Sequence, residues 1–170
     1  MSLNKIELPG IVIAELYKNS LIAETETTIA ISNTTENSLY KFLGNNHKKI
    51  TLIVNEENVA FLPETHLNFI SKILEACKMN IADVAIVNQQ TKPVIIADLK
   101  KQLEPSFTVL FGITPIEIKL PINFPQFKPQ QYDACTYLYS PALSELNKDS
   151  EEGKLLKSKL WVCLRKLFEV

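Results

Sequence analysis

Polar residues that could do chemistry follow four stretches of apolar, β-branched sequence. The four clusters are Asn55-Glu56-Glu57-Asn58, Asn88-Gln89-Gln90, Gly112 with Thr114, and Tyr139-Ser140. In an open parallel sheet, ligands bind beyond the carboxyl ends of the strands. A carboxylate such as Glu56 could orient a water molecule there, and an amide such as Asn88 could read the polar edge of a ring. Strand ends are also polar because Asn and Gln suit turns, so both interpretations stay open.

The other ligating and nucleophilic side chains do not have the spacing of a known site. His47 and His66 lack metal-site spacing, and we interpret both as solvated surface residues. Cys77, Cys135 and Cys163 form no CxxC pair, so we expect ordinary core cysteines. The chain has four glycines and they are not clustered, which excludes a phosphate-binding loop of the Walker or dinucleotide type. We therefore expect no metal site and no cofactor.

Composition places the chain among ordinary globular proteins. It has 170 residues, 46 % of them apolar and 22 % charged, which suits one domain. The net charge of -1 creates no global field that would attract nucleic acid or membrane. The start does not resemble a secretory signal, and no apolar run approaches the ~20 residues that span a bilayer. We expect a cytoplasmic protein that does not enter a membrane.

The N-terminal part differs from the rest of the chain. Apolar residues near helical spacing predict a short amphipathic helix over 8–18. Its apolar positions are Ile11, Val12, Leu16 and Tyr17. The composition of the following stretch at 24–38, which is rich in threonine and asparagine, predicts a linker. The sequence thus predicts an arm and linker over 1–40 and a core over 41–170, with the helix of the arm as a partner-binding element.

Alternating strand and helix patterns predict the architecture of the core. Four short apolar strands are expected at 49–54, 83–88, 108–111 and 136–139. Helical spacing predicts helices over 64–78 and 151–168. Together these elements predict a three-layer α/β/α fold with a small, mainly parallel, four-stranded sheet.

Two segments of the core could instead contact a partner. The last helix carries Trp161, which could be a core residue or a partner anchor. Its cations, which we interpret as a solvated face, are Lys154, Lys157, Lys159, Arg165 and Lys166. The proline-rich segment 115–129 carries an apolar tip at 122–125, which fits a partner pocket or a satellite core equally well.

The order of these pieces resembles the uracil-DNA glycosylase superfamily. Residues 50–90 resemble its first motif block, 109–112 its next strand and glycine, and 139–143 the place of its His-Pro-Ser motif. The resemblance puts Glu56 at the position of the catalytic acid and Asn88 at that of the base-reading amide. The loop after the first strand lacks the glycines and proline of the family, and no histidine lies near 139. Glu56, Asn88 and Ser140 are therefore vestigial candidates, and no catalytic residue is predicted.

Within that superfamily, the chain most resembles the non-catalytic psi-subunit family of the bacterial DNA polymerase III holoenzyme. The resemblance is carried by the arm, by Ser140-Pro141-Ala142-Leu143 and by Leu160-Trp161 in the last helix. It implies a non-enzymatic adaptor whose protein partners are clamp-loader subunits and a chi-like subunit. A divergent glycosylase that hydrolyses the N-glycosidic bond of a damaged base is the alternative, and a core that binds a small molecule at the strand ends is a third. Direct contact with DNA is left open by the sequence.

Overall fold

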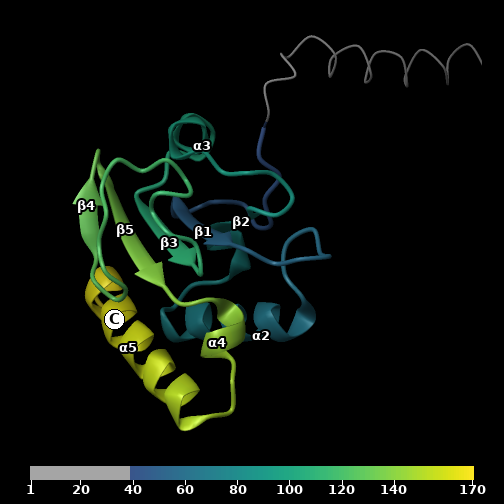
Figure 1. Cartoon of the computed structure of the whole chain (residues 1–170), viewed down its shortest axis with the longest axis vertical. Coiled ribbons are helices and arrows are strands. Elements are labelled where there is room, and N and C mark those ends of the chain that lie inside the picture. The colour runs from purple at the N-terminus through teal and green to yellow at the C-terminus, as the bar shows by residue number, and fades with distance from the viewer. Residues whose placement is uncertain (1–38) are drawn as a thin grey trace, which may run out of the picture. The chain divides into compact units, whose positions relative to one another are not determined.

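The computed structural model describes residues 39–170 (Figure 1). The predicted arm helix at 8–18, with Ile11, Val12, Leu16 and Tyr17, and the predicted linker at 24–38 lie outside the described residues.

The described residues form a mixed α/β fold around one five-stranded sheet. Its strands are β1 (Ile50–Val54), β2 (Val84–Asn88), β3 (Phe107–Phe111), β4 (Gln130–Tyr132) and β5 (Cys135–Ser140). The strand order is β2-β1-β3-β5-β4, and every neighbouring pair is parallel except β4 with β5. The mainly parallel sheet and its four buried strands are confirmed.

The predicted number of four strands is wrong, because β4 adds an antiparallel edge. Its three residues are polar or amphipathic and exposed, so they lack the apolar alternation that marks a strand. What makes the strand is a two-residue hairpin: Tyr132 pairs with Cys135, and Asp133 and Ala134 between them have φ of 46° and 59°. Positive φ at both central residues is the geometry of the tightest hairpin turns.

Helices cover both faces of this sheet. They are α2 (Glu64–Ala76), α3 (Ile96–Leu103), α4 (Leu143–Leu146) and α5 (Glu151–Phe168), with a 3₁₀ turn η1 at Ile81–Asp83. Figure 1 shows α3 above the sheet and α2, α4 and α5 below it. The predictions for α2 and α5 are confirmed to within two residues, whereas α3 and α4 were not expected. Both are short, and α3 offers only Ile96, Leu99 and Leu103 as buried apolar positions.

The alternation of side chains along each strand produces one core on each side of the sheet. On one side, Leu52 packs in a cluster with Ile70 of α2 and Leu160 of α5. On the other, Ile53 packs with Leu99 of α3 in a second cluster. All five residues of β1 and all five of β2 are buried, so both faces of these strands need a cover.

The proline-rich segment 115–129 completes the core on the α3 side. Ile118, Leu120 and Phe124 are each at most 6 % exposed and belong to the same cluster as Leu99. The apolar tip at 122–125 therefore packs against the main core on this side of the sheet, with Phe124 buried and Ile122 partly buried, and it does not form a separate satellite core.

Residues before β1 close the outer edge of the sheet at β2. Leu43 and Ile86 exchange two backbone hydrogen bonds of 2.9 and 2.8 Å. Gly44 follows with φ of 104°, and a Cβ at this position would lie 2.1 Å from the carbonyl oxygen of Val84. Only glycine permits this close approach, which satisfies backbone groups that a bare edge strand would leave unpaired.

Cys77, Cys135 and Cys163 are all free and buried, as predicted for core cysteines. Burial raises the pKa of each thiol above its ordinary value. Within residues 39–170, none of the helices combines the length and the apolar character needed to cross a membrane.

Tyr137 of β5 gives a test of the core on the α3 side. Its side chain is completely buried, and among the described residues its hydroxyl has no hydrogen-bond partner. Burial, and after it the neighbouring Cys135 thiol, raise the pKa of Tyr137 well above its ordinary value. Above pH 10, the ordinary pKa of tyrosine, the unfolded chain therefore loses a proton that the folded chain keeps, and stability must fall as the pH rises.

We predict that Tyr137→Phe leaves the free energy of unfolding at pH 7 unchanged or raises it by about 1 kcal/mol, because a buried hydroxyl without a partner is removed. The stability lost between pH 9 and pH 11 should be smaller than in the wild type. Urea denaturation at both ends of this range measures the two effects. A loss of more than about 2 kcal/mol at pH 7 would show that the hydroxyl makes a stabilising bond.

Candidate functional site

The carboxyl edge of the sheet brings Glu56 and Asn88 together. Asn88 ends β2, is 2 % exposed, and accepts hydrogen bonds at Oδ1 from the backbone N–H groups of Glu56 and Gln90, both 3.1 Å long. Its Nδ2 donates to the carbonyl oxygens of Glu56 at 2.8 Å and Val59 at 3.0 Å. An amide has two donors and two acceptor lone pairs, and all four are engaged. Asn88 therefore ties the loop after β1 to the end of β2.

The side chain of Glu56 is held in turn by His66 from the first turn of α2. Glu56 Oε1 lies 2.9 Å from His66 Nδ1, and the two side chains are only 17 % and 13 % exposed. The interpretation of His66 as a solvated surface residue is therefore wrong, because the loop folds back over the start of α2. His47, in contrast, is exposed. A carboxylate positioned by an imidazole has the geometry of a general base that orients water.

Ser140 lies apart from this pair. It ends β5, it is fully buried, and its Oγ has no hydrogen-bond partner within residues 39–170. Its carbonyl oxygen accepts a 2.9 Å hydrogen bond from Gly112, which holds together the ends of β3 and β5. Since β3 lies between β1 and β5, Ser140 is about 10 Å across the sheet from the end of β1. Of the three vestigial candidates, the structure thus brings together two.

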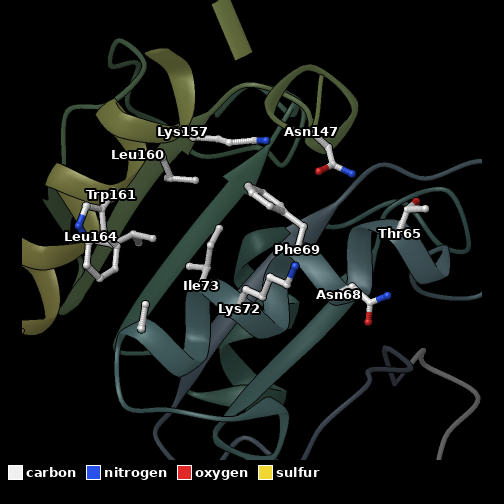
Figure 2. Close-up of a pocket in the computed structure, with 11 residues that line it drawn as sticks. Thr65, Asn68, Phe69, Lys72, Ile73, Asn147, Lys157, Leu160, Trp161 and Leu164 are labelled. Atoms are coloured by element: carbon white, nitrogen blue, oxygen red, sulfur yellow. The ribbon is translucent and has the colours of Figure 1, made fainter. Parts of the chain in front are cut away.

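A groove with a largely apolar lining lies between α2 and α5 (Figure 2). Its volume is about 430 Å³, within the range of ligand-binding pockets. Its lining comes from one stripe on each helix and from the residue that follows α4. The lining residues are Thr65, Asn68, Phe69, Lys72, Ile73, Ala76, Asn147, Lys157, Leu160, Trp161 and Leu164.

The groove has an apolar floor and a cationic rim. Leu160 and Leu164 are buried at its base, and Phe69, Ile73 and Trp161 are partly exposed above them. Lys72 and Lys157 supply the charge, and no acidic residue is among the lining residues. Lys157 Nζ lies 5.6 Å from the centre of the Phe69 ring, close enough for a cation–π contact. Such a groove suits an amphipathic ligand that carries negative charge.

The sequence pattern predicts only part of this groove. For Trp161, the sequence allows a core residue or a partner anchor; the structure packs this side chain against the core and leaves it partly exposed in the lining of the groove on α5. The prediction of a solvated face is wrong for Lys157, whose side chain is half-buried over Phe69, and confirmed for the other four cations of α5, which are exposed. Phe69 and Lys72 were missed, although the lining positions of α2 recur at intervals of three and four residues. That signal marks a helix face, but not which surface the face meets.

No protein-family model matches the chain, and a search of curated proteins finds no significant match. Within residues 39–170, no group of three or more histidine, cysteine or acidic side chains is placed to hold a metal ion. Functional assignment therefore depends on the geometry of the groove and of the carboxyl edge.

Because the Asn88 side chain makes four hydrogen bonds to the backbone, we predict that it stabilises the fold, and a substitution tests this. Asn88→Asp keeps the acceptors but removes both donors, and places a carboxylate against the carbonyl oxygens of Glu56 and Val59. We expect the free energy of unfolding to fall by about 3 kcal/mol, because two buried bonds are replaced by repulsion. Urea denaturation measures the loss.

Gln90→Glu makes the same change of charge at an exposed position two residues away, and should alter stability by less than about 0.5 kcal/mol. Equal, small effects of the two substitutions would mean that the loop after β1 is held by contacts other than those of Asn88.

Proposed function

We propose that this protein is a non-enzymatic adaptor that acts through protein–protein contacts. The observation that carries the proposal is the groove between α2 and α5, whose floor presents the side chains of Phe69, Ile73 and Trp161 to solvent. Partly exposed aromatic and aliphatic side chains in a concave site are the usual anchors of protein interfaces. Two helices that present such a groove match the helix-in-groove mode of recognition.

The specific adaptor that we propose is a psi-like accessory subunit of the replicative clamp loader. The resemblance to the psi-subunit family is carried by Ser140-Pro141-Ala142-Leu143 and Leu160-Trp161. In the structure the first segment leads into α4, and Leu143 and Leu160 belong to one buried cluster. The two segments thus contribute to one structural unit, with Trp161 at the groove. On this proposal the arm binds clamp-loader subunits and the core binds a chi-like subunit.

The adaptor is tested by affinity purification of the tagged full-length protein from its native cells, followed by mass spectrometry. We expect clamp-loader subunits to be recovered with the wild type and lost with the double variant Ile11→Asp and Leu16→Asp, because charges would replace the apolar face of the arm. The melting temperature should not change. Glu15→Gln with Lys18→Gln, on the polar positions of the same segment, is the matched control and should retain the partners.

Two outcomes would contradict this assignment. If no specific partner is recovered with the wild type, the proposed adaptor function is wrong. A fall in melting temperature of the arm variant alone would show that residues 8–18 belong to the folded core.

A second candidate function is favoured by the pairing of Glu56 with His66. In a divergent uracil-DNA glycosylase-like enzyme, the Glu56 carboxylate would orient the water that hydrolyses the N-glycosidic bond of a damaged base. We expect this enzyme to release bases from uracil-containing or deaminated DNA, and Glu56→Gln to abolish that release. Glu57→Gln, at the exposed neighbour, is the control and should keep it. Absence of cleavage over a panel of damaged bases would exclude this candidate.

A further inference from the structure

The groove between α2 and α5 has the length of a short peptide. Its lining positions on α2 extend from Thr65 to Ala76, which corresponds to about 16 Å of helix at 1.5 Å per residue. Those on α5 extend from Lys157 to Leu164, or about 10 Å. About three turns of a bound helix fit along such a surface, and they place side chains at i, i+3, i+4 and i+7 toward the floor.

Apolar contact would supply the affinity of such a segment. The rings of Phe69 and Trp161 and the side chain of Ile73 are partly exposed, so a ligand that covers them removes apolar surface from water. Figure 2 shows these side chains projecting into the space between the two helices. Leucine, isoleucine or phenylalanine side chains of a partner match this floor in size and chemistry.

The positive charge of Lys72 and Lys157 at the rim determines which apolar segments can bind in the groove. Within residues 39–170, neither Lys72 nor Lys157 has a carboxylate within 4.0 Å, whereas four other cationic side chains of lysine do. A neutral or basic segment would cover two ammonium groups without compensating them, which costs free energy. Carboxylates that flank the apolar anchors would pair with both groups and would also accelerate association.

We infer that this groove binds an acidic amphipathic segment of a partner protein, with its apolar side chains on Phe69, Ile73 and Trp161 and its carboxylates at Lys72 and Lys157. The inference rests on the adaptor function proposed above, and it adds the chemistry of the partner and the place on the core where it binds.

Trp161 makes the inference directly measurable, because it is the only tryptophan of the chain. We would titrate the full-length protein with two tryptophan-free 14-residue peptides and follow its fluorescence. Both peptides carry leucine and phenylalanine anchors at i, i+4 and i+7; one has four flanking glutamates and the other has four lysines. We expect the acidic peptide to shift the Trp161 emission and to bind at least tenfold more tightly than the basic one. Its Kd should rise with NaCl concentration, because salt screens the ion pairs.

Charge reversal then tests the rim. We expect Lys72→Glu with Lys157→Glu to weaken binding of the acidic peptide at least tenfold and to favour the basic peptide. The matched control reverses two exposed lysines outside the groove, Lys128→Glu with Lys159→Glu, which changes the net charge equally and should leave the Kd within twofold. Circular dichroism establishes that each variant is folded. Equal affinity for both peptides, or equal loss in both double variants, would overturn the inference.

Purification from native cells with the same variants separates this inference from the adaptor function. If the wild type recovers specific partners and Lys72→Glu with Lys157→Glu recovers them equally well, the adaptor stands and the groove is not its acidic-segment site. If the acidic peptide binds as expected but no partner is recovered, the specificity of the groove stands and the adaptor function fails.

Discussion

Burial of β1 and β2 on both faces is the constraint on which the rest of the structure depends. Parallel strands of this kind are stable only if helices cover the sheet above and below. The two faces of the sheet are covered by different kinds of element. One helix, α3, and the segment 113–124 cover one face, while α2, α4 and α5 cover the other. Because α2 and α5 lie on the same face, their outer stripes border a common groove. The candidate binding surface is thus a consequence of how the sheet is covered.

The carboxyl edge of the sheet shows how a pattern typical of catalysis can serve structure. Asn88 occupies the end of a buried strand, where an amide can read a ligand, but its four hydrogen-bonding positions are all used by backbone groups. The same bonds hold the loop that carries Glu56 against His66. A hydrolase needs a carboxylate in a fixed orientation, so the contact between Glu56 and His66 is compatible with the glycosylase candidate. Asn88 itself is engaged in holding the loop.

Adaptor and enzyme place function on different parts of the molecule. The groove depends on side chains of α2 and α5, and the carboxyl edge depends on the loops after β1 and β2 and on His66 at the start of α2. Their proposed ligands also differ in kind: the groove with Lys72 and Lys157 would bind an acidic segment of a protein, whereas Glu56 would act on a base of DNA. Lys72 and Lys157 on one surface and Glu56 on the other can be substituted separately, so experiments can distinguish the two candidate functions.

The sequence by itself determined the parallel sheet, its four buried strands, helices α2 and α5, and the burial of the three cysteines, because each depends on a local apolar pattern. It did not determine β4, whose pairing follows from the turn at Asp133–Ala134, or α3, whose two turns show too little periodicity. Asn88 and Glu56 were found as strand-end residues, but only the tertiary structure showed that backbone groups engage the first and that His66 holds the second. The groove, too, required the fold: Lys72 and Lys157 lie far apart in the sequence, and their proximity is set by the packing of two helices on one sheet.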